Sequence, residues 1–131
     1  MNLVSIRIIT KDVKRLVQFY ERAVAPARWL TEEFAEVATP TCTIAIGSER
    51  TMTMFGAGAA SGANNRSVIL EFRVDNVDKE YERLEGVLRE VVQEPVTQPW
   101  GNRSLLFRDP DGNLINFFTP VSTEARARYG L

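Results

Sequence analysis

The order of predicted elements in this chain repeats once along its length. Residues 4–9 are typical of a short strand, and residues 13–24 place apolar side chains at helical spacing. After a stretch rich in Gly and Ala over residues 56–65, a strand and a helix return at residues 68–74 and 77–88. The repeated order of elements predicts two similar modules joined by a flexible linker.

Three more strands are expected in each half, because β-branched and alternating runs follow each helix between turn residues. Thr10 or Asp12 is expected to cap the first helix, and Asn76 the second. Placing Asp12 on Asn76 aligns the two halves, which then both have the order strand, helix, strand, strand, strand. The expected strands are residues 28–37, 41–46 and 50–55 in the first half, with a turn at 47–49, and residues 90–96, 103–107 and 114–119 in the second.

The second half ends in a predicted β-hairpin whose turn is strongly specified. The run from Asp109 to Asn113 reads Asp-Pro-Asp-Gly-Asn, in which Pro presets φ and Gly permits a positive φ. Asn116 then stands as a polar side chain between apolar neighbours on the returning strand. Burial of such an amide without hydrogen-bond partners is costly, so Asn116 is a candidate functional residue.

This hairpin, together with the Trp100-Gly101 that precedes it, resembles the closing hairpin of the vicinal oxygen chelate superfamily. That superfamily includes glyoxalase I, extradiol dioxygenases, and fosfomycin and bleomycin resistance proteins. The run from Phe72 to Asp78 is similar to the family's mid-chain signature. The resemblance implies an α+β fold in which two tandem βαβββ modules form a curled mixed sheet around a cavity, with the helices outside. The expected organisation is a first module over 1–56, a linker over 57–65, a second module over 66–120 and a tail over 121–131, within a single structural domain.

The resemblance also implies where a metal would bind. The family's ligands are typically His, Gln or Glu on the first and last strands of each module. By position they correspond here to Ser5, Thr53, Ile69 and Asn116. Because none of these is His, Asp or Glu, a divalent ion would lack charged ligands to offset its dehydration. We therefore expect no metal and no other cofactor. Glu71 shares a strand face with Ile69 and is the one carboxylate to consider.

The residues expected to line the cavity include those that share a strand face with these four positions. Asn116 is either a ligand-anchoring amide or a hydrogen-bonding member of the sheet, and Glu71 either orients a ligand or lies at an edge. Trp100 is either a stacking surface for a planar ligand or a packing lid. No catalytic residue is predicted. The candidate ligand-binding residues, each with core packing or a solvated surface as its alternative, are Asn116, Trp100, Ser5, Thr53, Arg7, Glu71, Met52, Met54, Trp29, Phe34 and Arg103.

The composition excludes several classes of function. The chain of 131 residues has no histidine, which excludes Ser-His and Cys-His nucleophile systems. Its single cysteine, Cys42, cannot form an internal disulfide, and with no visible secretory signal this favours the cytoplasm. A net charge of −1 gives no field that would attract nucleic acid, and no apolar run approaches the roughly 20 residues of a membrane span.

The leading hypothesis is a metal-free homodimer that binds or sequesters a small amphipathic or aromatic molecule without catalysis, as resemblance to the bleomycin resistance proteins implies. The alternative is a metal-dependent lyase, isomerase or dioxygenase of the same superfamily with an atypical ligand set, for instance Glu71 with carboxylates from a partner subunit. A third hypothesis is an interaction module that uses its sheet and has no small-molecule pocket.

Overall fold

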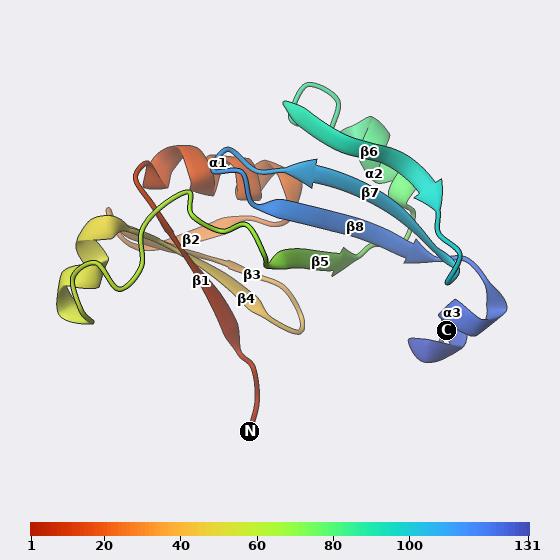
Figure 1. Cartoon of the computed structure of the whole chain (residues 1–131), viewed down its shortest axis with the longest axis horizontal. Helices are drawn as coiled ribbons and strands as arrows, with labels where there is room; N and C mark the ends of the chain where they lie inside the picture. Colours follow the sequence, from red (N-terminus) through yellow and green to blue (C-terminus); the bar gives the residue numbers. More distant parts are fainter. The chain divides into compact units, whose positions relative to one another are not determined.

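Two four-stranded sheets divide the chain into two units. A computed structural model describes all residues from 1 to 131. Unit 1 comprises Met1–Asn65 and Pro110–Gly112, and unit 2 comprises Arg66–Asp109 and Asn113–Leu131. Each unit contains one mixed sheet and the helix that follows its first strand (Figure 1). The predicted α+β class and the two repeated modules are confirmed, and the eight strands are hydrogen-bonded as two sheets.

Unit 1 holds the elements of the first module. They are β1 (Ser5–Thr10), α1 (Val13–Ala23), β2 (Ala27–Thr31), β3 (Phe34–Ala38), β4 (Thr43–Ser48) and a 3₁₀ helix, η1 (Glu49–Met54). The strand order is β1-β4-β3-β2, in which β1 and β4 are parallel and the other neighbours are antiparallel. As predicted, Asp12 caps α1, because its carboxylate accepts the backbone N–H of Arg15 at 3.2 Å. Leu16 and Tyr20 are fully buried on the face of α1 that packs on the sheet.

The end of the first module differs from the prediction. The stretch over residues 28–37 forms two strands, β2 and β3, and β4 extends through the predicted turn at 47–49 as far as Ser48. Residues 50–55 were expected to be the last strand, but this segment is mostly the 3₁₀ helix η1. The physical reason is local, since Thr51 Oγ1 donates to the carbonyl of Ser48 at 2.6 Å and Thr53 Oγ1 to that of Arg50 at 2.9 Å. Such bonds to carbonyls three residues earlier favour a tight helical turn over an extended strand.

The Gly- and Ala-rich stretch at 56–65 has no regular secondary structure, in agreement with its composition. One of its residues is nevertheless fixed within unit 1. Gly62 is buried against the backbone of Thr10 and Lys11, so closely that a Cβ would lie 3.0–3.2 Å from their atoms. Its N–H donates to Glu49 Oε2 at 3.4 Å. The stretch is therefore held at one point by close packing.

Unit 2 repeats the layout of unit 1 and adds a C-terminal helix. Its elements are β5 (Ile69–Arg73), α2 (Val77–Arg83), β6 (Glu90–Thr97), β7 (Asn102–Arg108), β8 (Leu114–Pro120) and α3 (Thr123–Arg128). The strand order is β5-β8-β7-β6, with β5 parallel to β8 (Figure 1). The core beneath α2 is aromatic, because the Phe117 ring meets those of Phe107 and Phe72 edge-on at 5.0 and 5.5 Å. None of the helices has the length and apolar composition that crossing a membrane requires.

The predicted turn between β7 and β8 forms as a closed hydrogen-bonded loop. Asp109 Oδ1 accepts the backbone N–H of Asn113 at 2.9 Å, and its Oδ2 accepts the Asn113 side-chain amide at 2.7 Å. Both residues are buried, and Gly112 has a φ of +85°. The turn residues that the sequence indicated therefore fix the hairpin that presents Asn116.

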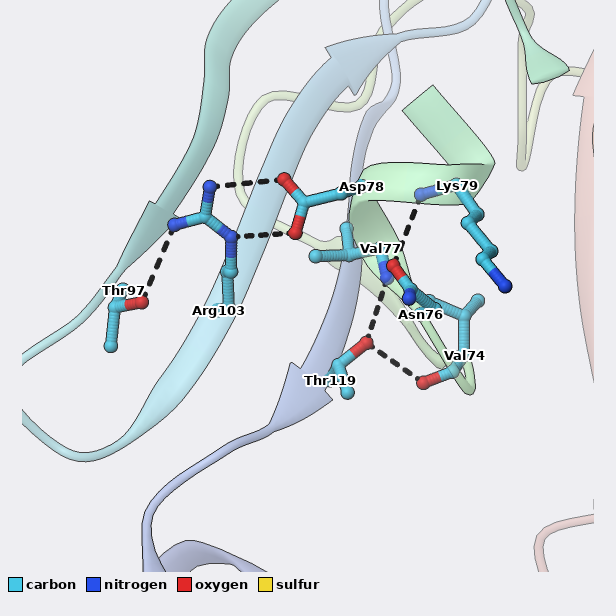
Figure 2. A network of polar contacts seen from close by, with 8 residues as sticks. All are labelled: Val74, Asn76, Val77, Asp78, Lys79, Thr97, Arg103 and Thr119. Carbon is cyan, nitrogen blue, oxygen red and sulfur yellow. Dashed lines mark hydrogen bonds and ion pairs between the residues drawn. The ribbon is translucent and has the colours of Figure 1, made fainter. Parts of the chain in front are cut away.

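Polar contacts tie the start of α2 to the sheet (Figure 2). The hydroxyl of Thr119 on β8 accepts the backbone N–H of Val77 and donates to the carbonyl of Val74, both at 2.9 Å. Asn76 caps the helix by accepting the N–H of Lys79 at 3.1 Å, as its alignment with Asp12 predicted. One side chain from the last strand thus satisfies two backbone groups at the entry to α2.

An ion pair links α2 to β7 on the same side of the sheet. Arg103 donates to both oxygens of Asp78, at 2.8 and 2.9 Å, and also contacts the hydroxyl of Thr97 at 3.4 Å (Figure 2). The hydrogen bonds from Arg103 lower the pKa of Asp78, and those to Asp78 raise the pKa of Arg103. This bidentate ion pair orients α2 on the sheet.

Replacing Thr119 with Val is expected to destabilise the protein by about 1–3 kcal/mol, because two backbone groups at the start of α2 lose their partner. Urea unfolding followed by circular dichroism measures the loss. Thr97→Val is the matched control, since its hydroxyl makes only a long, exposed contact, and its effect should stay within about 0.5 kcal/mol. Equal effects of the two substitutions would contradict the role of Thr119.

Asp78→Asn is expected to lower the urea midpoint at pH 7, and the difference from the wild type should shrink as the solution is acidified. The folded-state pKa of Asp78 lies below its ordinary value of 3.8, so the stabilisation is present above that value and is lost as the pH falls through the folded pKa. The effect is small because both partners are partly exposed. Asp75→Asn, which removes an exposed carboxylate with no ion pair, is the control, and a difference for Asp78→Asn that persists in strong acid would contradict the assignment.

Candidate functional site

The sheet of unit 2 has one face beneath α2 and an opposite face, which we call the distal face of unit 2. Side chains alternate between the faces, so Leu70, Ile115 and Phe117 are buried beneath α2 while their neighbours point the other way. The strand register places nine side chains of β5, β8 and β7 together on the distal face. They are Ile69, Glu71, Arg73, Ser104, Leu106, Arg108, Leu114, Asn116 and Phe118.

Glu71 and Asn116 form a hydrogen-bonded pair on the distal face of unit 2. They are 45 residues apart in sequence and directly opposite each other in the parallel register of β5 and β8. Asn116 Nδ2 donates to Glu71 Oε2 at 2.7 Å, while Asn116 Oδ1 is buried and has no partner. Since only the NH₂ group of the amide can donate to a carboxylate, this bond fixes the orientation of the amide. A buried acceptor without a donor costs about 1–3 kcal/mol.

The arginines of the distal face are engaged with partners other than Glu71. The guanidinium of Arg73 lies over the ring of Tyr129, 5.4 Å from its centroid, and Arg108 is 3.8 Å from a carboxylate oxygen of Glu90. Glu71 itself is exposed and makes no ion pair. The negative charge of Glu71 is therefore not neutralised by an ion pair.

The structure separates the other two predicted residues of unit 2 from this pair. Arg103 is on the α2 side of the sheet, where it binds Asp78 (Figure 2). Trp100 lies between β6 and β7 with 57% of its surface exposed, and its backbone carbonyl accepts a hydrogen bond from Arg128. Arg103 thus has a structural contact, whereas the indole of Trp100 is available at the end of the sheet.

In unit 1, Arg7 lies between two aromatic rings on the sheet face opposite α1. Its guanidinium carbon is 5.0 Å from the centroid of Phe34 and 4.9 Å from that of Phe55. Ser5 is on the same face of β1 and is exposed, whereas Trp29 pairs with the buried Ala35 on the α1 side. Of the residues predicted here, the structure brings Arg7 and Phe34 together and adds Phe55, which lies just beyond η1. Phe55 was within the strand expected over residues 50–55 but was not among the predicted site residues.

The correspondence of Thr53 with Asn116 is wrong, because Thr53, Met52 and Met54 lie on η1 and not on a strand. The pairing of β1 with β4 identifies the residue of unit 1 that is equivalent to Asn116, which is Ala45. The alignment of the helix caps places Arg7 at the position of Glu71, and Arg7 is paired with Ala45 as Glu71 is with Asn116.

The residues at the positions of the family's ligands do not fit a divalent metal. With Ala45 in place of Thr53, the set becomes Ser5, Ala45, Ile69 and Asn116, in which two side chains have no ligand atom and the amide nitrogen of Asn116 is bonded to Glu71. The chain also has no group of three or more His, Cys, Asp or Glu side chains arranged to hold a metal ion.

A second feature of unit 1 is a charged hollow of about 520 Å³ at the start of α1, which the sequence did not indicate. It depends on η1 folding back toward β4, where a Cβ at Gly47 would lie 2.9 Å from Thr51 Oγ1. Three of its carboxylates have partners within unit 1: Glu33 lies 3.5 Å from Arg50, Asp12 accepts the N–H of Arg15 and Glu49 accepts that of Gly62. The lining residues are Lys11, Asp12, Val13, Lys14, Glu32, Glu33, Ser48, Glu49 and Arg50.

Comparisons with known proteins agree with this architecture. Residues 2–117 match the sequence model of the Glyoxalase/Bleomycin resistance protein/Dioxygenase superfamily. The uncharacterized protein YraH of Bacillus subtilis (strain 168) is 32% identical over 125 residues, which cover 90% of this chain and 98% of YraH.

Two solved structures have the same fold. A glyoxalase/bleomycin resistance protein/dioxygenase family enzyme from Burkholderia phytofirmans PsJN aligns with a TM-score of 0.80 at 16% identity, over 92% of this chain and all of that chain. A glyoxalase/bleomycin resistance protein/dioxygenase from Nocardioides aligns with a TM-score of 0.77 at 20% identity, over 94% of this chain and 85% of that chain.

Two substitutions of Asn116 test the geometry of the pair. Asn116→Asp places a carboxylate against Glu71 and should destabilise the protein by about 1–3 kcal/mol at pH 7, less in acid where one carboxyl takes up a proton. Asn116→Leu, of similar size, removes the unpaired acceptor while exposed Glu71 regains water, so its stability should stay within about 1 kcal/mol of the wild type. Urea unfolding at pH 7 and pH 4.5 measures both variants, and equal stability of the two at pH 7 would contradict the pairing.

Proposed function

Because the chain belongs to the glyoxalase/bleomycin resistance protein/dioxygenase superfamily, we propose that it binds or sequesters a small amphipathic or aromatic molecule, without a metal and without catalysis. The observation that carries the proposal is the buried, unpartnered carbonyl of Asn116 beside the exposed carboxylate of Glu71. Buried polar groups in proteins nearly always have partners. A ligand that donates to the Asn116 carbonyl would supply the hydrogen-bond partner that this amide lacks.

The surroundings of the pair suit a molecule with an apolar body. Ile69 is half exposed and precedes Glu71 on the same face of β5, while Leu114 and Leu106 lie next to Asn116 in the register of β8 and β7. Small-molecule sites typically combine apolar walls with a few polar groups that fix orientation. The distal face of unit 2 has both.

We also propose that the protein acts as a homodimer in the cytoplasm. Apolar side chains are exposed on two edge strands, with Trp29 and Leu30 on β2 and Val92 and Val96 on β6. Exposed apolar edges of this kind are typical of association surfaces. The single cysteine, Cys42, is free, which is consistent with a reducing compartment.

The second candidate is a metal-dependent lyase, isomerase or dioxygenase with an atypical ligand set. One observation favours it, namely that Glu71 is an exposed carboxylate that makes no ion pair. In this case Glu71 would need carboxylates from a partner subunit to complete a site, since Asn116 contributes a single amide oxygen.

A thermal-shift screen of aromatic and amphipathic compounds in the presence of a chelator tests the binding proposal. A ligand at about 100 times its Kd should stabilise the protein by about 2.7 kcal/mol, and Asn116→Leu should abolish the shift. Glu82→Gln, which changes an exposed carboxylate on α2, is the control and should retain it.

Elemental analysis of protein purified without chelator, with zinc, manganese, nickel and iron added in parallel, separates the two candidates. We expect no stoichiometric metal. One tightly held ion per chain would contradict the binding proposal and favour the enzyme.

A further inference from the structure

We propose that the molecule bound at the distal face of unit 2 carries a cationic nitrogen with at least two N–H donors, such as a primary ammonium or an amidinium, and that this nitrogen bonds both Glu71 and Asn116. The inference rests on the proposed function and specifies its ligand chemistry. It follows from what the pair offers to a ligand, namely two acceptor oxygens, one of which belongs to a charged carboxylate.

The hydrogen bond within the pair uses one N–H of the Asn116 amide, and the Glu71 carboxylate has no donor of its own. Asn116 Nδ2 donates to Glu71 Oε2, which leaves the Asn116 carbonyl oxygen and the second oxygen of the Glu71 carboxylate as acceptors. A ligand group that brings two N–H donors can bond one to each residue. A ligand group that offers only acceptors could use one amide N–H at most, and it would leave both acceptor oxygens without a partner.

The amide cannot adapt to an acceptor ligand without a cost. Rotation of the Asn116 amide by half a turn would present its NH₂ group outward, but it would place Oδ1 against Glu71 Oε2, where the 2.7 Å hydrogen bond now lies. Two acceptors at that distance repel each other. Together with the negative charge of Glu71, this repulsion disfavours carboxylates and phosphates at the pair.

Charge favours the same ligand chemistry. Arg73 is placed over Tyr129 and Arg108 beside Glu90, and neither forms an ion pair with Glu71. A cationic nitrogen would form a charge-assisted hydrogen bond with this carboxylate, which is stronger than a bond between neutral groups. Ile69 and Leu114, beside the pair, would contact the apolar part of such an amphipathic amine.

Three indole compounds that share an apolar body but differ in their polar group test the inference. Tryptamine carries an ammonium, tryptophol a hydroxyl and indole-3-acetate a carboxylate. Titrations of the full-length ¹⁵N-labelled protein should show that tryptamine shifts the side-chain amide signals of Asn116 and binds at least about ten-fold more tightly than tryptophol. Indole-3-acetate should leave those signals unchanged.

Two variants test whether the binding of tryptamine depends on the Glu71–Asn116 pair. Glu71→Gln should weaken tryptamine binding by about ten-fold or more, to the level of tryptophol, because the charge is lost while the size of the side chain is kept. Glu82→Gln makes the same change on the exposed side of α2 and should leave tryptamine binding unchanged. The amide spectrum of each variant reports whether it is folded.

Three results would overturn the inference. They are binding of tryptophol or indole-3-acetate at the pair as tight as that of tryptamine, tryptamine binding that Glu71→Gln leaves intact, and no shift of Asn116 by any probe up to about 10 mM. The first of these would still support small-molecule binding, because a neutral or anionic molecule would then occupy the site. The proposed function itself is decided by the compound screen, which does not depend on a cationic group.

Discussion

The parallel pairing of the first and last strands in each module is the constraint on which the structure depends. In unit 2 it places β5 beside β8, so that Glu71 and Asn116 become direct neighbours although 45 residues separate them. A parallel pair requires a crossover connection, and α2 with β6 and β7 provides it. Because α2 packs on one face of the sheet, the polar pair is left on the other.

The entry to α2 shows how that crossover is stabilised. Thr119 of β8 satisfies the N–H of Val77 and the carbonyl of Val74, so the strand that presents Asn116 also fixes the start of the helix. The Asp78–Arg103 pair adds a contact between α2 and β7. These contacts lie on the face opposite Glu71, so one face of the sheet packs against α2 and the other presents the Glu71–Asn116 pair.

The two modules have the same topology but present different chemistry at equivalent positions. Where unit 2 has Glu71 paired with Asn116, unit 1 has Arg7 paired with Ala45, and Arg7 lies between two aromatic rings. The strand register, which the backbone sets, is conserved between the modules, while the side chains at that register are not. This is why membership of the superfamily indicates the fold but does not by itself indicate the reaction or the ligand.

The sequence by itself determined the repeat of the modules, both helix caps and the turn from Asp109 to Asn113, because each depends on local propensities and hydrogen bonds within a few residues. It also singled out Asn116. Only the tertiary structure decided that Glu71 is its partner and that residues 50–55 form a helical turn instead of the last strand. The pairing of strands that are distant in sequence depends on the packing of the whole module. Whether residues 50–55 add a strand to the sheet or keep their local hydroxyl bonds depends on it too. The pattern of residues along one segment does not contain this information.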